Sequence, residues 1–231
     1  PVVCAGRMEP DVGAQAIADG KIDAMGVARQ FLTDPEWVTK IIEDRIEDIK
    51  PCICCHSACF NFSSSKGHAN TQDLFDTMGL SRCALNPKTM QSKKYKIVPA
   101  KKSKKIAIIG GGIGGMEAAI VCAQRGHKVD LYEKTDKLGG VFIAAAAPSF
   151  KEKDRDLIAW YNREIQKYPI EIKMNTTVTD VKSVSDGRAV FVKGALVGEK
   201  IEVRILKATK TAVYGKIENI ITPSEHRCEP S

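Results

Sequence analysis

Five cysteines lie close together between residues 51 and 83, and their spacing is the feature of this sequence best suited to chemistry. Taken as Cys52, Cys55, Cys59 and Cys83, they form C-x2-C-x3-C followed by a distant fourth cysteine. Clustered thiolates with this spacing are typical of soft-metal sites, and of iron–sulfur clusters in particular. The C-x2-C pair lets two sulfurs converge within one turn of chain. The sequence therefore predicts a metal centre with these four ligands.

Two other uses of the cysteines stay open. A structural zinc site also takes four thiolates. Such sites usually contain two C-x2-C pairs, however, and Cys83 is not part of a second pair. Disulfides are possible on numbers alone, but the sequence shows no signal peptide and no membrane-spanning apolar segment, so we expect a cytoplasmic protein with reduced thiols. Cys54 and His56 lie inside the motif, and either could replace a neighbour as a ligand.

A glycine-rich loop is the second chemical feature. Residues 105–109 read as an apolar strand that runs into Gly110-Gly111-Gly112-Ile113-Gly114-Gly115, before a helix that ends near Gly126. This is G-x-G-x-x-G between a strand and a helix, which is the setting of a dinucleotide-binding loop. The alternative is a glycine-rich turn that binds nothing.

Each glycine of this loop has an expected task. Gly110 permits the tight turn, Gly112 lets the backbone approach a pyrophosphate at the helix N-terminus, and Gly115 allows close packing of helix on strand. The next strand ends at Glu133, at the expected distance for a carboxylate that accepts hydrogen bonds from a ribose.

The elements around the glycine loop follow in order. A strand over 128–132 precedes Glu133, and Leu138-Gly139-Gly140 forms a second glycine turn. Helical spacing of apolar residues predicts a helix over 153–167, and residues 170–174 return as a strand. Together these elements predict a β-α-β-α-β unit.

The first 30 residues show a repeated β/α pattern. Residues 1–6 and 22–27 read as buried parallel strands, and Pro10 to Asp19 has the spacing of a helix. A basic residue, Arg7 or Arg29, follows each strand. Loops at the carboxyl ends of such strands hold ligands, and two arginines there would suit a phosphate. Surface or salt-bridge arginines are the alternative.

A further helix is expected to lead directly to the cysteines. Asp34 would cap it and Pro35 would open it. Its apolar residues fall on one face: Trp37, Ile41, Ile42, Ile46 and Ile49. Beyond Cys59 a polar segment of 23 residues precedes Cys83. Because the cost of loop closure rises only logarithmically with length, this gap does not exclude Cys83 as a ligand.

Composition excludes other classes of function. At 231 residues, 43% hydrophobic and 27% charged, the chain is an ordinary globular protein with room for one large or two small domains. The formal charge of +7 would be offset by an anionic cluster and by flavin phosphates. Lysines cluster between residues 93 and 105 without a motif that recognises the grooves of a nucleic acid. We therefore expect a solvated linker and neither nucleic-acid nor membrane binding.

The end of the chain has the alternating pattern of strands at residues 189–192 and 201–205.

Taken together, these motifs resemble the iron–sulfur flavoenzyme branch of the old yellow enzyme family, over residues 1 to about 180. The resemblance implies an α/β protein: the C-terminal end of an FMN-binding (β/α)8 TIM barrel over 1–50, a [4Fe-4S] segment over 51–90 and a linker over 91–104. A partial Rossmann-like FAD-binding domain would occupy residues 105–186. Residues 187–231 would form a strand-rich tail to which no role is assigned.

The resemblance also implies site residues. The cluster ligands would be Cys52, Cys55, Cys59 and Cys83. The FMN site would include Gly6, and the FMN-phosphate contacts would be Arg7, Ala28 and Arg29. The FAD contacts would be Gly110, Gly112, Gly114, Gly115, Glu133, Lys134, Gly140, Val141, Lys151 and Val178.

The implied activity is reduction of an activated C=C bond, with electrons passing from NAD(P)H to FAD, the cluster, FMN and then a small-molecule enoate, enoyl-CoA or steroid-type substrate. Most of the barrel, with the groups that bind the flavin ring, lies outside this sequence. We therefore expect a fragment, inactive by itself, of an oxidoreductase that could be a homo-oligomer. A flavoprotein like the small subunit of glutamate synthase and a non-catalytic cofactor-binding remnant are the alternatives.

Overall fold

The chain divides into two units in the computed structural model. The first comprises residues 1–98 with 139–167, and the second comprises residues 99–138 with 168–231. The structure describes residues 1–57, 59–60, 81–179, 184, 189–193, 200–208 and 212–222. The polar segment expected between Cys59 and Cys83 therefore lies almost entirely outside the described residues. Each unit is considered by itself.

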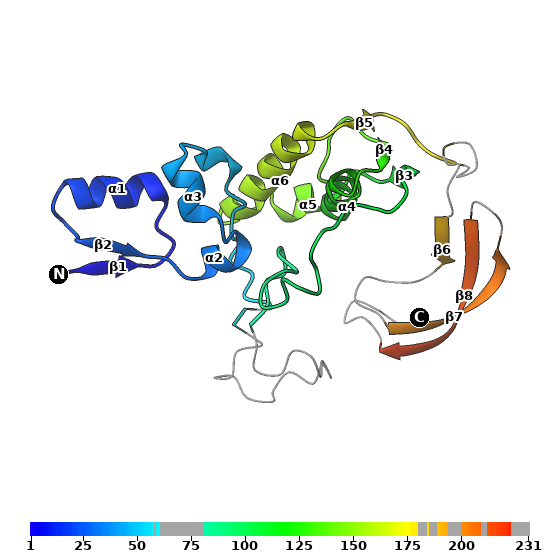
Figure 1. Cartoon of the computed structure of the whole chain (residues 1–231), viewed down its shortest axis with the longest axis horizontal. Coiled ribbons are helices and arrows are strands. Elements are labelled where there is room, and N and C mark those ends of the chain that lie inside the picture. Colours follow the sequence, from blue (N-terminus) through cyan, green and yellow to red (C-terminus); the bar gives the residue numbers. More distant parts are fainter. Residues whose placement is uncertain are drawn as a thin grey trace. The chain divides into compact units, whose positions relative to one another are not determined.

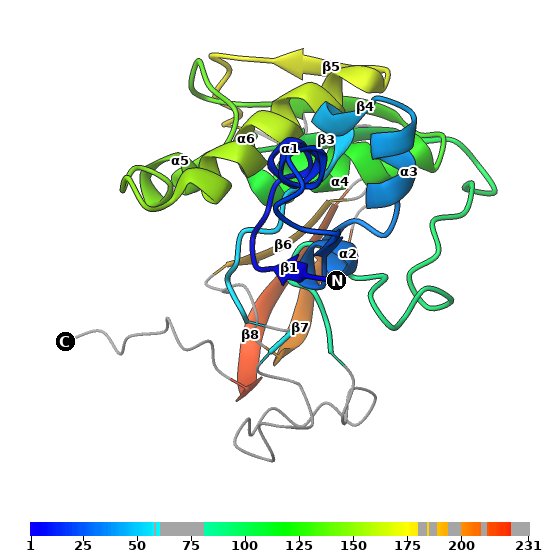
Figure 2. The same cartoon turned by 90° about the vertical axis from the view of Figure 1, so that its left-hand side faces the viewer.

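The first unit begins with the strand-helix-strand that the sequence predicts. Strands β1 (Val3–Ala5) and β2 (Ala24–Gly26) pair in parallel, and helix α1 (Pro10–Ala18) connects them. Both Figure 1 and Figure 2, which looks down the axis of α1, show the helix over one side of the pair. A Cβ at Gly13 would lie 2.2 Å from the sulfur of Met25, so this glycine lets the helix pack closely on β2.

The helix expected after Asp34 is shorter than the sequence suggests. Helix α3 spans Trp37–Ile42, and a separate 3-10 turn, η1, spans Ile46–Asp48. The break falls at Asp44, whose φ of 53° is left-handed and cannot continue a right-handed helix. The expectation of one apolar face is also wrong, because Ile42 is 79% exposed whereas Trp37 is 9% exposed. A short helix, α2 (Arg29–Thr33), precedes α3 and was not predicted.

Two later helices complete the first unit: α5 (Val141–Ala145) and α6 (Glu152–Glu164), which continues into the 3-10 turn η3 (Ile165–Lys167). The helix predicted over 153–167 is thus confirmed, and Leu157 and Ile165 on its apolar face are fully buried.

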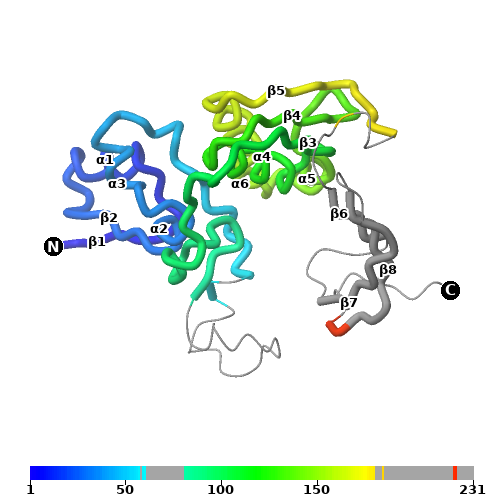
Figure 3. The backbone as a smooth tube through the Cα atoms, turned by 45° about the vertical axis from the view of Figure 1, so that its right-hand side comes forward, coloured from blue at the N-terminus to red at the C-terminus, as the bar shows by residue number. Residues whose placement is uncertain are grey.

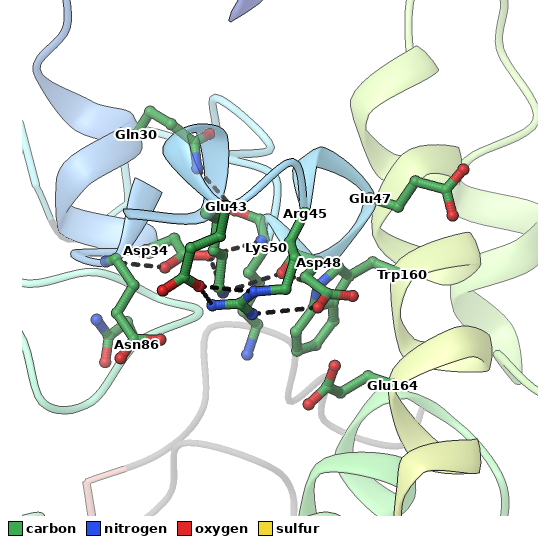
Figure 4. A network of polar contacts seen from close by, with 12 residues as sticks. Gln30, Asp34, Glu43, Arg45, Glu47, Asp48, Lys50, Asn86, Trp160 and Glu164 are labelled. Carbon is green, nitrogen blue, oxygen red and sulfur yellow. Dashed lines mark hydrogen bonds and ion pairs between the residues drawn. The ribbon is translucent and has the colours of Figure 1, made fainter. Parts of the chain in front are cut away.

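Contacts between α6 and η1 join these helices to the start of the chain. Trp160 donates from its indole Nε1 to the carbonyl oxygen of Asp48 over 2.9 Å. The Lys167 ammonium lies 2.5 Å from the Asp48 carboxylate. Figure 4 shows Trp160 of α6 directed toward Asp48.

The second unit contains the three strands and the first helix of the predicted β-α-β-α-β unit, whereas the predicted second helix, α6, belongs to the first unit. Strands β3 (Lys105–Ile109), β4 (Lys128–Tyr132) and β5 (Ile170–Lys173) are parallel, and α4 (Ile113–Gln124) connects the first two. Figure 3 shows β4 between its two neighbours. Met116 of α4 and Leu131 of β4 are fully buried, as expected where an apolar helix covers a parallel sheet.

A second sheet of the same unit has the order β6-β8-β7. Strands β6 (Ala189–Lys193) and β7 (Lys200–Ala208) confirm the predicted strand-like segments, whereas β8 (Ala212–Thr222) was not predicted. Figure 1 shows β8 in the middle, parallel to β6 and antiparallel to β7. Of the helices in the described part of the chain, none is long and apolar enough to cross a membrane.

Candidate functional site

The cysteine motif folds around a single pocket in the first unit. Its lining includes Cys52, Cys54, Cys55, His56, Cys59 and Cys83. The remaining wall comes chiefly from α2, through Arg29, Leu32 and Thr33. The structure therefore brings together all four cysteines that the sequence proposes as ligands, including Cys83 from the far side of the polar segment.

The backbone separates Cys54 from its neighbours. Cys54 and His56 both have left-handed φ angles, of 55° and 58°, so the chain reverses on either side of Cys55. The Cys54 thiol lies 3.6 Å from the carbonyl oxygen of Cys52 and donates to it. Burial raises the pKa of Cys54, and the adjacent Cys52 thiol adds to this effect. The hydrogen bond from the Cys54 thiol to the backbone favours Cys55 as the ligand of the pair.

The sulfur of Cys83 has two hydrogen-bond partners. The backbone N–H of Leu85 donates to this Sγ over 3.4 Å, and the Thr33 hydroxyl also lies 3.4 Å from it. Hydrogen bonds to cysteine sulfurs tune iron–sulfur clusters, and the Leu85 N–H supplies one such bond here.

Among the residues that the structure describes, no three histidine, cysteine or carboxylate side chains come close enough to hold one ion between them. A single zinc ion needs four donors within about 2.3 Å, whereas each thiolate of an iron–sulfur cluster binds a different iron. Four cysteines around one pocket match the number of thiolates that such a cluster takes.

Helix α2 holds both halves of the cysteine segment. The Gln30 side-chain amide donates to the Lys50 carbonyl oxygen over 2.8 Å and accepts from the Cys52 N–H over 2.9 Å. On the other half, Asn86 and Thr89 donate to the carbonyl oxygen of Leu32 over 2.9 and 2.7 Å. Sequence reasoning missed these residues, because nothing in their local pattern distinguishes them from surface polar residues.

Asp34 anchors the approach to the motif. Its carboxylate is 4% exposed and accepts from the Lys40 ammonium over 2.6 Å and from the Lys50 backbone N–H over 2.9 Å. Figure 4 shows Asp34 and Gln30 on either side of the chain at Lys50. Asp34 also accepts from the Glu36 N–H over 3.1 Å, so it orders the turn before α3.

A larger cavity, of about 440 Å³, opens at the carboxyl ends of β1 and β2. It is lined by all four residues expected at the FMN site: Gly6, Arg7, Ala28 and Arg29. Gly6 and Arg7 both have positive φ, of 123° and 53°, which turns the chain sharply at the strand end. Lys153 and Arg163 of α6 also line the cavity and were not foreseen from the sequence.

The two cavities share part of their walls. Arg29, Cys52 and Cys54 line both the cysteine pocket and the larger cavity. The Arg29 guanidinium also donates to the Nε2 atom of His56, which lines the cysteine pocket.

In the second unit, the glycine loop has the geometry that a dinucleotide needs. Gly110 has a φ of 105°, and a Cβ at Gly115 would lie 1.9 Å from the Gly110 carbonyl oxygen. A Cβ at Gly114 would meet nothing within 4 Å, so the space beside the first turn of α4 is open. Close packing and an open helix N-terminus together fit a pyrophosphate.

Glu133 is directed at this loop. Its buried carboxylate accepts from the Gly111 N–H over 2.7 Å and from the Thr135 N–H over 2.8 Å. Burial raises its pKa, but these hydrogen bonds and the nearby Lys134 outweigh burial, so the pKa lies below its ordinary value. An ionised Glu133 has the charge state needed to accept from ribose hydroxyls. The requirement for glycine at 111, where a Cβ would lie 2.4 Å from Leu138, was missed.

The other residues expected to contact FAD are scattered. Lys134 is exposed beside Glu133, and Val178 is half-buried beyond β5. Gly140, Val141 and Lys151 belong to the first unit. Val141 is 93% exposed, and Lys151 pairs with Asp154 over 3.1 Å. Their FAD contacts stay predictions.

Comparison with known proteins gives matches over much of the chain. The family model described as pyridine nucleotide-disulphide oxidoreductase matches residues 73–206. The chain is 38% identical over 180 residues to cinnamate reductase from Clostridium sporogenes, covering 78% of this chain and 25% of that protein. It is 33% identical over 216 residues to NADH oxidase from Thermoanaerobacter brockii, covering 93% and 31%.

The fold also matches a solved structure, that of 2-naphthoyl-CoA reductase in complex with 2-naphthoyl-CoA. The TM-score is 0.69 and the sequence identity 32%, over 87% of this chain and 29% of that one. The chain therefore spans between a quarter and a third of the length of these relatives.

Proposed function

Because the chain belongs to the pyridine nucleotide-disulphide oxidoreductase family, we propose that it is the electron-transferring part of a flavin and iron–sulfur oxidoreductase. Its relatives confirm the resemblance to the iron–sulfur flavoenzyme branch of the old yellow enzyme family. We propose that the intact enzyme reduces an activated C=C bond in a small enoate, enoyl-CoA or steroid-type molecule with electrons from NAD(P)H.

The proposed division of the chain is that given by the resemblance. Residues 1–50 would complete an FMN barrel, 51–90 would hold the cluster and 105–186 would bind FAD. When bound, these cofactors would supply single-electron transfer between two flavins that need not touch. The chain's own residues would bind and orient them.

The shared wall between the two cavities is the observation that carries this proposal. Arg7 and Arg29 provide cationic side chains at the strand ends, where a flavin phosphate would bind. Cys52 lines the same cavity and also the cysteine pocket. A cluster held by Cys52 would therefore lie beside the flavin site, as an electron relay requires.

The donor set of the cysteine pocket supports a cluster within it. Cys52, Cys55, Cys59 and Cys83 line one pocket, and the Cys83 sulfur accepts a hydrogen bond from the Leu85 N–H. In the second unit, the ionised Glu133 beside an open glycine loop supports binding of the FAD adenosine and pyrophosphate.

A serine series tests the ligand assignment. The chain would be purified without oxygen, reconstituted with iron and sulfide, and assayed for both. We expect about four irons and about four sulfides per chain in the wild type, and a clear loss of iron in Cys52→Ser, Cys55→Ser, Cys59→Ser and Cys83→Ser.

Two cysteines serve as controls in that series. Cys54→Ser should keep the full iron content, because its thiol faces the Cys52 carbonyl. Cys122→Ser in α4, outside the cysteine pocket, should also keep it. Loss of iron in Cys54→Ser together with full iron in Cys55→Ser would reverse the assignment of this pair.

A further inference from the structure

We propose that Lys50 is the positioning residue that holds Cys83 beside the other cysteines. This inference rests on the proposed function, since it concerns how the chain assembles the cluster ligands. The sequence leaves unexplained how Cys83, which follows the long polar segment, reaches the pocket formed by Cys52, Cys55 and Cys59. Besides the bonds from Asn86 and Thr89 to Leu32, Lys50 contacts both halves of the segment directly and joins them next to Cys83.

The backbone of Lys50 fixes the first half. Its N–H donates to the buried Asp34 carboxylate over 2.9 Å, and its carbonyl oxygen accepts from the Gln30 amide over 2.8 Å. The same Gln30 side chain accepts from the N–H of Cys52, two residues later. The position of Lys50 is therefore tied to that of the first ligand.

The side chain of Lys50 fixes the second half. Its ammonium donates to the carbonyl oxygen of Leu85 over 3.0 Å, although the two residues are 35 positions apart in the chain. The N–H of the same Leu85 donates to the Cys83 sulfur over 3.4 Å. Leu85 thus accepts from Lys50 with one backbone group and donates to the fourth cysteine with the other.

The surroundings of Lys50 explain how a cation is accommodated there. The residue is 9% exposed, and its ammonium lies 4.9 Å from the ring centroids of both Trp160 and Tyr161. A buried ammonium is costly without such partners. Figure 4 shows Lys50 near the turn at Asp48 and the indole of Trp160. The two aromatic rings and the Leu85 carbonyl together orient the side chain toward Cys83.

Loss of the Lys50 ammonium should therefore act on one cysteine rather than on four. In Lys50→Met the backbone bonds to Asp34 and Gln30 remain, so Cys52 and Cys55 keep their positions. The Leu85 carbonyl loses its donor, so the turn that carries Cys83 is loosened, while Asn86 and Thr89 still hold the later part of the segment to Leu32. We expect a centre with Cys83 detached and the other three cysteines bound.

The test is thiol alkylation of the iron-loaded chain without oxygen, with each cysteine followed by peptide mass spectrometry. In the wild type all four ligands should be protected. In Lys50→Met, alkylation of Cys83 should be faster by about tenfold, the factor expected for one lost charge-assisted hydrogen bond, while Cys52, Cys55 and Cys59 stay protected. The iron content should fall toward about three per chain.

Lys40→Met is the matched control. Lys40 is another largely buried lysine of the first unit, and its ammonium contacts Asp34 and the Asp48 carbonyl but not the segment of Cys83. This variant should keep Cys83 protected. Lys50→Gln, which removes the charge and shortens the side chain, should reproduce the selective labelling and keeps the claim testable if Lys50→Met does not fold.

The outcomes separate this inference from the proposed function. Equal labelling of all four cysteines in the folded Lys50 variants, or continued protection of Cys83, would overturn the role of Lys50. A wild type that binds no iron and sulfide would instead overturn the proposed function, whatever the lysine variants do.

Discussion

The carboxylate of Glu133 accepts a 2.7 Å hydrogen bond from the backbone N–H of Gly111. This bond joins the end of β4 to the glycine loop that follows β3, within the second unit. It fixes the loop before any nucleotide binds, and it places a negative charge where a ribose would lie. The bond therefore has consequences for both stability and binding.

Replacement of Glu133 should destabilise the second unit in a pH-dependent manner. The folded-state pKa of Glu133 is lowered from its ordinary value of 4.5, so its contribution is fully present above pH 4.5 and is lost as pH falls through the lower folded pKa. Glu133→Gln should reduce the free energy of unfolding at pH 7 by about 1–3 kcal/mol. Denaturant titrations at pH 7 and in acid would check this. An equal deficit at both pH values would contradict it.

Two neighbouring glycines should respond differently to alanine. A Cβ at Gly115 would lie 1.9 Å from the Gly110 carbonyl oxygen, so Gly115→Ala must displace backbone and should cost about 1–3 kcal/mol or more in the free energy of unfolding. Gly114→Ala meets nothing within 4 Å and should be neutral or slightly stabilising in a helix.

Gly114→Ala should affect FAD binding although it leaves stability intact. Gly114→Ala places a methyl group in the open space proposed for the pyrophosphate, so it should weaken FAD binding although the protein is stable. Thermal unfolding and FAD fluorescence titration measure the two effects. Unchanged FAD binding in a stable Gly114→Ala protein would count against this placement of the pyrophosphate.

The Thr33 hydroxyl should tune the proposed cluster. It lies 3.4 Å from both the Cys83 sulfur and the Arg29 carbonyl oxygen, and its single proton can serve only one of them. A metal-bound thiolate would draw that proton, so Thr33→Val should lower the reduction potential by removing a hydrogen bond to sulfur. A redox titration followed by electron paramagnetic resonance would measure the shift. Thr33→Ser, which keeps the hydroxyl, should restore the wild-type potential; equal potentials in all three proteins would exclude this role.

Much of the fold is predictable from local signals. The apolar strand before Gly110, the glycine spacing and the carboxylate at Glu133 each depend on residues near one another in the sequence, and the structure confirms the β-α-β unit that they predict. The strands on either side of α1 are confirmed for the same reason.

The break after α3 was not predictable from the same signals. Apolar spacing through Ile46 and Ile49 suggests a continuous helix, but Asp44 adopts a left-handed φ and ends it. A left-handed aspartate leaves no mark on hydrophobic periodicity, since αL is a local alternative open to many polar residues.

The residues that support the cysteine site were also not predictable from the sequence. The cysteines are recognisable by spacing, whereas Gln30 and Lys50 act on residues 22 and 35 positions away. A single polar residue in a helix or before a proline gives no indication of such a partner. Long-range contacts of this kind become visible only once the chain is folded.

The metal content of the wild-type chain tests the central claim most directly. The protein would be purified without oxygen, and iron, acid-labile sulfide and zinc would be measured on the same sample. An electron-relay site predicts iron and sulfide in equal amounts, about four of each per chain, with little zinc. Zinc without sulfide would contradict the relay and leave the four cysteines as a structural site.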